Sequence, residues 1–336
     1  MRIAIIGAGG AHKTEASLAR AAISLGHAAR VFDVTGWSRR LGTPGIELKR
    51  RLVERFQPDF LLFTRHAIRL GTETLQQLIV GRSAAFWYFD LAPTPPPDVV
   101  ALGKAAGVLY ITCPQQMPAY RAAGIPEVRF LPQAADPIGD RPAPNAPARY
   151  RCDVSFVGSG QYAHRHQLLS RISDVASLQI RGRNWDGING LQAIGGPVYG
   201  PRFARVVRGA SISLGIHAFA EQDRQAMCAS NRMWKILACG GFYLGPRVEG
   251  IETFARDGEH CAWYESDAEA VSLVERYLAA PEERRMIAEV GHRHALACHT
   301  YAHRIRKLLA GESFPTGDPR PVKRSDSFET RTPGAR

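Results

Sequence analysis

Two glycine-rich stretches contain residue types that bind phosphate, and the first of them is GAGGAHKT at residues 7–14. It departs from both the dinucleotide fingerprint and the P-loop, because His12 stands where either motif requires glycine. A side chain at that point of a phosphate-cradling turn is a steric fault. Three interpretations stay open: an ordinary strand-to-helix turn, a P-loop formed by Gly7–Thr14, or a turn that presents His12 and backbone N–H groups to a substrate.

The second glycine-rich stretch, at residues 158–160, follows a predicted apolar strand. Gly158 and Ser159 belong to the turn, and Arg165 stands at the start of the next predicted helix. A glycine turn with a guanidinium near a helix N-terminus is suited to phosphate, because it combines backbone donors with positive charge. The pattern predicts a phosphate site in the second half of the chain.

Further cationic and loop residues lie between positions 230 and 254. Arg232 and Lys235 are three residues apart and would share one face of a helix. After the next strand, a loop through Gly250 leads into another helix, where backbone N–H groups would face an anion. Each residue alone also fits a solvated surface. Together with Arg165, they predict a site for a nucleotide that carries a diphosphate.

Asp90 ends the apolar run AAFWYFD at residues 84–90. Ligands of doubly wound sheets bind at the carboxyl ends of the strands, so this carboxylate would act as a general base or bind hydroxyl groups. A helix cap or a turn aspartate is the simpler alternative. His12 is the other candidate base, because imidazole titrates near neutral pH.

The elements that must position these residues alternate between short apolar strands and amphipathic helices. In the first half, strands are expected at 2–6, 29–34, 58–64, 84–90, 107–113 and 128–132. In the second half, they are expected at 152–158, 178–182, 211–216, 241–245 and 260–264. Such alternation predicts α/β domains with parallel sheets covered on both faces, and two of them would face each other across a cleft.

The proline-rich segment 136–149 breaks every hydrophobic period and is predicted to be a linker. The predicted organisation is therefore a first α/β domain at residues 1–135, a linker at 136–150 and a second α/β domain at 151–300. A helix at 301–311 would return to the first domain, and a disordered tail would follow at 312–336.

Composition excludes several classes of protein. Hydrophobic residues make up 45% of the 336 residues and charged residues 22%, an ordinary globular balance. The sequence has no signal-peptide pattern and no apolar stretch long enough to span a membrane, so a cytoplasmic protein is expected. The net charge of +12 comes mostly from scattered arginines and admits phosphates, nucleic acid or anionic lipid as partners. The six cysteines form no CxxC and no Cys/His cluster, which argues against structural disulfides and zinc.

Over residues 150–310 the sequence resembles the CgeB-like glycosyltransferases, the spore maturation protein CgeB type within the group 1 glycosyltransferases. The resemblance rests on CDVSFVGSGQYAHRHQLL, SNRMWKILACGGFYLGP and EGIETFARDGEHCAWYES, in this order, and it is looser over 1–135. It implies the GT-B fold, with two doubly wound Rossmann-like domains facing across a cleft. The domain at 1–135 would be the acceptor-side domain, and the domain at 151–300 would be the nucleotide-sugar-binding domain. The implied activity is transfer of a sugar from a nucleotide-diphosphate sugar.

The resemblance also implies roles for individual residues. Gly158, Ser159 and Arg165 would lie near the diphosphate, and Tyr199 near the base. Arg232, Glu249 and Gly250 would lie near the ribose, phosphate or sugar. Lys235 stands where many group 1 relatives carry a glutamate that binds ribose. Lysine cannot accept those hydrogen bonds, which marks Lys235 as a candidate phosphate ligand instead.

The implied mechanism needs no metal, because arginine, lysine and helix N-termini would stabilise the leaving diphosphate. An inverting enzyme would use His12 or Asp90 as its base, whereas a retaining enzyme needs none. The acceptor stays open among a glycan, a protein, a small molecule and a modified nucleic acid. The alternatives are a P-loop-like NTPase or nucleotide-binding regulator that uses Gly7–Thr14, and a sugar-nucleotide-binding module without catalysis.

Overall fold

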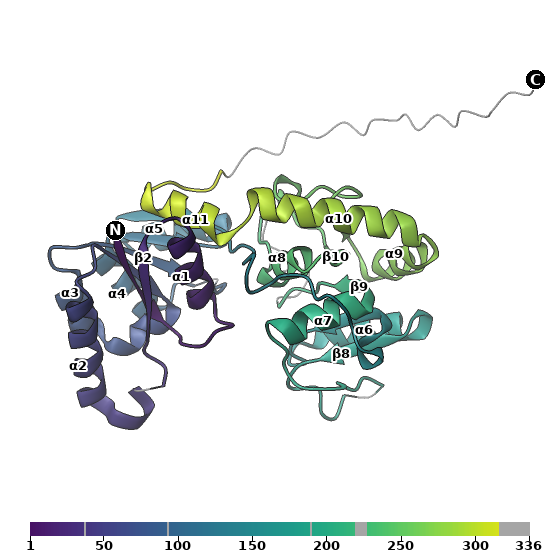
Figure 1. Cartoon of the computed structure of the whole chain (residues 1–336), viewed down its shortest axis with the longest axis horizontal. Coiled ribbons are helices and arrows are strands. Elements are labelled where there is room, and N and C mark those ends of the chain that lie inside the picture. The colour runs from purple at the N-terminus through teal and green to yellow at the C-terminus, as the bar shows by residue number, and fades with distance from the viewer. Residues whose placement is uncertain (37, 93, 189, 219–226, 316–336) are drawn as a thin grey trace, which may run out of the picture.

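The structure is a computed structural model that describes residues 1–36, 38–92, 94–188, 190–218 and 227–315. Its chain forms two parallel β-sheets, each with helices packed around it (Figure 1). The predicted α/β class with two Rossmann-like domains is therefore confirmed. The predicted tail at 312–336 lies outside the described residues from position 316 onward.

The first sheet has six strands in the order β2-β1-β3-β4-β5-β6. Their bounds are β1 Arg2–Gly7, β2 Ala28–Asp33, β3 Phe60–Thr64, β4 Ser83–Tyr88, β5 Val108–Ile111 and β6 Glu127–Phe130. Alternate residues of β1 enter two different cores: Ala4 and Ile6 pack on one face of the sheet, and Ile3 and Ile5 on the other. Because both faces are covered, the strands read as nearly continuous apolar runs.

The helices of this domain are α1 Thr14–Ser24, α2 Ser38–Phe56, α3 Thr72–Ile79, α4 Pro97–Ala106 and α5 Met117–Ala122, with 3-10 turns η1 Arg65–Leu70 and η2 Pro114–Gln116. The predicted helix near 47–56 is the second part of α2. That helix is kinked at Gly42, whose φ of 54° is non-helical, and Pro44 follows the kink.

The second sheet has five strands in the order β11-β10-β9-β7-β8. The strands are β7 Cys152–Val157, β8 Leu178–Arg181, β9 Ala210–Leu214, β10 Tyr243–Pro246 and β11 Ala262–Tyr264. The helices are α6 Ala163–Val175, α7 Pro201–Gly209, α8 Asn231–Ala238, α9 Asp267–Ala279 and α10 Pro281–Cys298, with 3-10 turns η3 Ala148–Tyr150 and η5 Ile251–Thr253.

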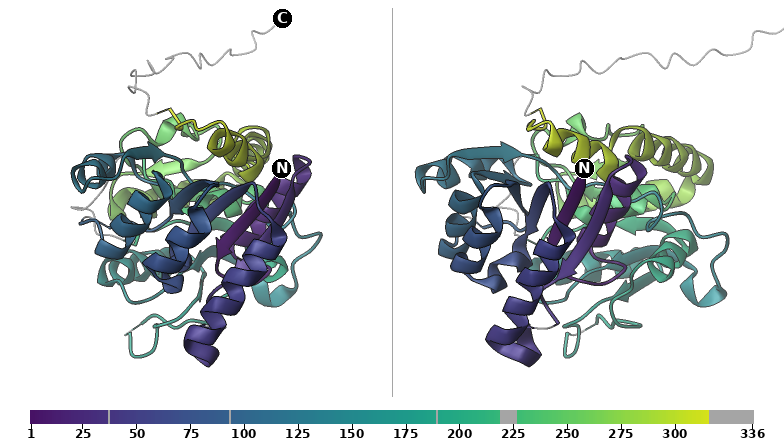
Figure 2. Two further views of the ribbon diagram at one scale, coloured as in Figure 1. Left: turned by 90° about the vertical axis from the view of Figure 1, so that its left-hand side faces the viewer. Right: turned by 60° about the vertical axis from the view of Figure 1, so that its left-hand side comes forward.

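The chain crosses between the domains twice, and the two crossings lie side by side. The Ala135 N–H donates to the His299 carbonyl at 2.8 Å, and the Tyr301 N–H donates to the Ala135 carbonyl at 2.9 Å. Helix α11, Tyr301–Leu309, then packs on α1 of the first domain (Figure 1). Figure 2 shows from two other sides that α11, in yellow, lies beside the purple N-terminal elements. The fully buried Arg304 secures this helix by donating to the Pro132 carbonyl at 2.9 Å.

Candidate functional site

A pocket of about 800 Å³ lies where the carboxyl ends of the two sheets meet. The first domain contributes residues that follow β3, β4 and β5, and the second contributes residues that follow β7 and β9 together with the start of α8. The polar lining residues are Arg65, Tyr88, Asp90, Thr112, Gln133, Tyr162, Arg165, His217, Ser230, Asn231 and Arg232. The site is thus built by both domains, at the position where doubly wound sheets bind ligands.

Arg165 lies on the second-domain wall of the pocket and is only 3% exposed. Its guanidinium donates to three backbone carbonyls: Ser159 at 2.7 Å, His217 at 3.1 Å and Ile216 at 3.3 Å. The ring of Tyr162 lies 4.4 Å from the guanidinium carbon. These contacts fix the side chain in one orientation beside the glycine turn that follows β7.

Arg232 comes from α8 and lies beside the same turn. Its Nη1 donates to the Ile216 carbonyl at 3.0 Å, and the ring of Phe156 lies 4.8 Å from the guanidinium carbon. A side chain at Gly158 would place its Cβ 2.9 Å from the Arg232 Nη2 atom. Glycine at 158 therefore keeps the turn open to this guanidinium.

The two arginines repel each other. Burial, followed by the positive charge of Arg232, lowers the pKa of Arg165 to about 9. Burial also lowers the pKa of Arg232. Among the described residues, the hydrogen bonds of both side chains end on backbone carbonyls, and no carboxylate forms an ion pair with either. A bound dianion would relieve this repulsion, so the wall is suited to a diphosphate.

The N-terminus of α8 completes this wall. Ser230 caps the helix by accepting the Arg232 N–H at 3.3 Å, and Ser230 and Asn231 both line the pocket. The Asn231 Oδ1 atom is buried and has no hydrogen-bond partner among the described residues. An unpartnered acceptor inside a polar pocket is suited to a hydroxyl group of a ligand.

The first-domain wall carries Asp90, just after β4. Its carboxylate pairs with the Arg65 guanidinium, and both side chains remain partly exposed to the pocket. Among the described lining residues, Asp90 is the one carboxylate. Sequence reasoning selected Asp90 as a candidate base, and the structure places it across the pocket from the arginine wall.

His12, the other candidate base, is not among the lining residues. Its ring lies nearly parallel to that of Tyr199, with centroids 6.3 Å apart. The next residue, Gly200, has a φ of +50°, and a Cβ there would lie 2.6 Å from the His12 ring. His12 of the first domain and Tyr199 of the second domain therefore contact each other. Neither of them lies in the pocket that Asp90 lines.

The turn that carries His12 is occupied by carboxylates of its own domain. The buried Glu15 accepts the Ala8 N–H at 3.0 Å and the Thr64 hydroxyl at 2.6 Å. Asp33 accepts a hydrogen bond from the Gly9 backbone. The Ala8 and Gly9 N–H groups, two of those that a P-loop would direct at phosphate, are thus already used, and two carboxylates lie beside them.

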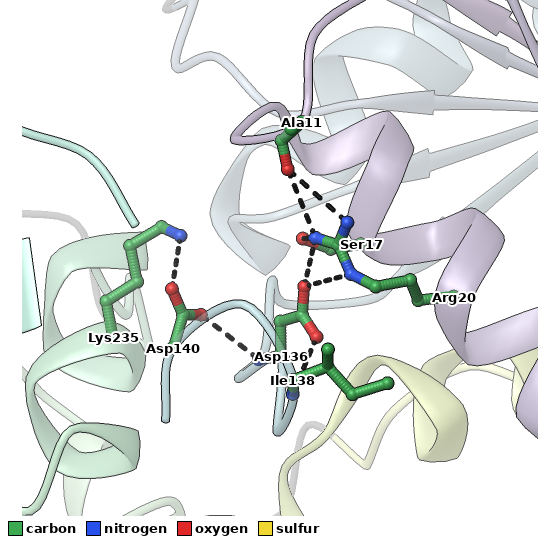
Figure 3. A network of polar contacts seen from close by, with 7 residues as sticks. All are labelled: Ala11, Ser17, Arg20, Asp136, Ile138, Asp140 and Lys235. Atoms are coloured by element: carbon green, nitrogen blue, oxygen red, sulfur yellow. Dashed lines mark hydrogen bonds and ion pairs between the residues drawn. The ribbon is translucent and has the colours of Figure 1, made fainter. Parts of the chain in front are cut away.

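Lys235 lies one helical turn beyond Arg232 but has a different partner. Its Nζ donates to the Asp140 carboxylate at 2.9 Å, and the other oxygen of that carboxylate accepts the Asp136 N–H at 3.1 Å (Figure 3). Asp136 in turn accepts from Arg20 Nε at 2.9 Å. This network joins α8 to α1 through the linker, and Lys235 does not line the pocket.

Glu249 and Gly250 do not line the pocket, but both contact Met227, which directly precedes the lining residue Cys228. The Glu249 carbonyl accepts the Met227 N–H at 2.6 Å. Gly250 has a φ of +74°, and a Cβ there would lie 2.5 Å from the Met227 side chain. The loop at residues 249–250 therefore packs against the segment 227–229 and helps to hold it at the edge of the pocket.

Sequence reasoning missed several lining residues, notably Arg65, Ser230 and Asn231. Ser230 had a signal, because a serine directly before a helical segment is a preferred N-cap. Arg65 follows β3 and had a weaker signal, its position at the carboxyl end of a strand.

Within the described ranges, no group of three or more His, Cys, Asp or Glu side chains is placed to hold a metal ion. No described helix is both long and apolar enough to cross a membrane.

The chain is similar to known glycosyltransferases in part of its sequence and in its fold. Residues 164–310 match the family model described as glycosyl transferase-like. Sucrose-phosphate synthase from Thermosynechococcus elongatus superposes with a TM-score of 0.65 at 12% identity, over 93% of this chain and 98% of that one. HepE from Anabaena, in complex with UDP and glucose, gives 0.64 at 12% identity, over 93% and 99%. A glycosyltransferase from Rickettsia africae gives 0.64 at 9%, over 92% and 97%.

The sequence has no significant match among curated proteins. The structural likeness nevertheless extends over nearly the whole length of both chains, and the family match includes Arg165 and Arg232. The chain has the two-domain fold of the GT-B glycosyltransferases, with a glycosyl transferase-like domain at residues 164–310.

Proposed function

We propose that the chain is a glycosyltransferase that moves a sugar from a uridine-diphosphate sugar to a hydroxyl group of an acceptor. The observation that carries the proposal is the pair Arg165 and Arg232, a buried and a partly buried cation without an ion-pair partner among the described residues. Such a pair favours a bound anion, and it faces a pocket of sufficient volume for a nucleotide sugar. The structural neighbour HepE, solved with UDP and glucose, supports uridine as the base.

In this proposal the diphosphate lies against Arg165, Arg232 and the N-terminus of α8. The turn at Gly158 and Ser159 borders it, and the Asn231 Oδ1 atom accepts a hydroxyl of the ribose or sugar. Charge that develops on the leaving diphosphate is then stabilised by fixed cations and backbone donors. Transfer is expected to survive EDTA; loss on chelation that is restored by Mn²⁺ or Mg²⁺ would contradict this part.

Asp90 is proposed as the group that receives the acceptor proton if the reaction inverts the sugar. Arg65 pairs with this carboxylate, and its position across the pocket from the arginines is suited to an acceptor hydroxyl. Retention requires no such base, so the anomeric configuration of the product separates the two mechanisms.

We also propose the CgeB type as the subtype within the group 1 glycosyltransferases. The proposal rests on the order of the motifs between residues 150 and 310. The acceptor is proposed only as a hydroxyl-bearing molecule.

The decisive experiment measures transfer and donor hydrolysis with UDP-sugars, together with UDP binding by calorimetry. We expect Asp90→Asn to reduce the transfer rate of an inverting enzyme by roughly 10²–10⁴-fold, the usual contribution of a general base. UDP affinity should stay unchanged, because Asp90 lies on the opposite wall. Asp98→Asn, a first-turn residue of α4, is the matched control. A chain that binds UDP but neither transfers nor hydrolyses any UDP-sugar would be a binding module.

A further inference from the structure

Two cysteine thiols from different domains meet beside the pocket. Cys113 follows β5 in the first domain, and Cys228 precedes α8 in the second. Both are buried, at 0% and 6% exposure, and their side chains are hydrogen-bonded to each other. Cys228 lines the pocket, as does Thr112, the neighbour of Cys113. The contact therefore lies between the two domains, beside the pocket.

The surroundings of the pair continue the interdomain contact. Met117 of the first domain packs against the core of the second domain, which includes Met227 and Ala229 on either side of Cys228. Apolar packing thus joins the two domains through residues close in sequence to both cysteines.

The two thiols have different chemical roles. Hydrogen bonds from the Cys228 thiol, and from the Gln115 and Gln116 backbone, lower the pKa of Cys113. The same contact with Cys113, together with burial, raises the pKa of Cys228. Hydrogen bonding thus favours the thiolate on Cys113, whereas Cys228 is the thiol that reaches the pocket.

We propose that Cys113 and Cys228 form a reversible disulfide that ties the two domains together across the pocket. With hydrogen peroxide as oxidant, one thiolate of the pair attacks a peroxide oxygen and the O–O bond breaks. The departing hydroxide takes up the proton that the thiol released, so a sulfenic acid and water form. The other thiol then attacks the sulfenic sulfur, and a second water leaves as the S–S bond forms. A dithiol reductant returns both thiols by exchange.

The disulfide would restrain the two domains from moving apart. A disulfide fixes two sulfurs at about 2.0 Å, whereas domain opening needs them to part. The remaining cysteines have no such partner across the domains: Cys152, Cys239 and Cys261 are in the second domain, and Cys298 is the exposed one. The bond should therefore form selectively between Cys113 and Cys228.

The test uses the full chain treated with hydrogen peroxide and no nucleotide, so its outcome does not depend on the proposed function. Non-reducing peptide mapping is expected to find one linked peptide pair, Cys113 with Cys228, lighter by two hydrogen atoms than the free thiols. Dithiothreitol should reverse it. Cys113→Ala and Cys228→Ala should each abolish the link, whereas Cys298→Ala, the matched control, should keep it. Free or over-oxidised cysteines at both positions, or a different pairing, would overturn the proposal.

The restraint on domain separation is measured in a second experiment. Oxidised wild type should unfold at a higher temperature than the reduced protein, and the shift should vanish in Cys228→Ala. UDP-sugar turnover of the oxidised form should fall roughly tenfold or more, because opening and product release limit the turnover of many enzymes. A linked protein with unchanged melting temperature and unchanged turnover would show that the bond does not restrain the domains.

Discussion

The two glycine-rich turns, at residues 7–14 and 158–165, look alike in sequence and differ in charge. In the first turn, Glu15 and Asp33 accept the N–H groups of Ala8 and Gly9. In the second, Arg165 donates to the Ser159 carbonyl, and Arg232 approaches Gly158. One turn is closed by carboxylates of its own domain, and the other is bordered by cations.

This difference shows that a glycine-rich strand-to-helix turn is not by itself a phosphate site. The surrounding charge must also be positive. Backbone donors are engaged in both turns, since the Gly158 and Gly160 N–H groups donate to the Arg181 and Arg183 carbonyls, each at 2.9 Å. Charge is what separates the two turns, and the acidic surroundings of the first argue against the P-loop alternative at Gly7–Thr14.

The largest expected effect is on nucleotide binding. Replacing Arg232 with alanine should weaken UDP binding by about 1.5–3 kcal/mol, the usual contribution of a hydrogen bond to a charged group. Stability should change little, because the Ile216 carbonyl keeps Arg165 as a donor. Lys13→Ala, in the first turn, is the matched control and should retain affinity. Calorimetry that finds the reverse pattern would restore the P-loop hypothesis.

Arg165→Ala is a less clean test, because this side chain also supports the fold. Its removal would leave the Ser159 and His217 carbonyls without this donor. We expect a loss of about 1–3 kcal/mol in unfolding free energy in addition to weaker UDP binding. Arg165 is thus both a binding and a structural residue, and wild-type stability in this variant would show that its carbonyl contacts are dispensable.

A smaller effect is expected from removing the buried Glu15 carboxylate beside the first turn. Glu15→Ala leaves the buried Ala8 N–H and Thr64 hydroxyl without their acceptor, so stability should fall by about 1–3 kcal/mol in chemical denaturation. Glu15→Gln retains an acceptor oxygen and should lose less. Neither variant should alter UDP affinity. New nucleotide binding at this turn in Glu15→Gln would mean that charge alone had closed a working site.

Acid should loosen the first turn before the second. Partial burial alone would raise the pKa of Asp33, but hydrogen bonds from Thr35 and the Gly9 backbone outweigh it, and the pKa lies below 3.8. A carboxylate with a lowered pKa stabilises the folded state above its unfolded pKa, and that contribution is lost as pH falls through the folded value. Hydrogen exchange, corrected for its intrinsic pH dependence, should therefore rise below about pH 4 at 7–14 relative to 158–165. An Asp33→Asn variant that responds to acid like wild type would refute this cause.

The smallest effect is expected at Lys235. Lys235→Met removes a charge one turn from Arg232, yet UDP affinity should change less than about twofold, since the Nζ atom is engaged by Asp140. A tenfold loss in calorimetry would instead identify Lys235 as a phosphate ligand, as sequence reasoning predicted.

The sequence by itself determined the architecture. Strand and helix periods depend on neighbours within a few residues, so the alternation of elements and the α/β class could be predicted. The same holds for Arg165, which local spacing places next to a glycine turn at a helix start.

Only the tertiary structure decided which polar groups were already engaged. Lys235 has its partner in the linker, the His12 ring meets Tyr199 of the other domain, and Cys113 meets Cys228. Each partner lies far away in sequence, and its approach depends on how the two domains dock. The type of a side chain sets its charge and its hydrogen-bond donors. Whether those donors are already engaged depends on the residues that the fold packs against them, and no local pattern in the sequence shows this.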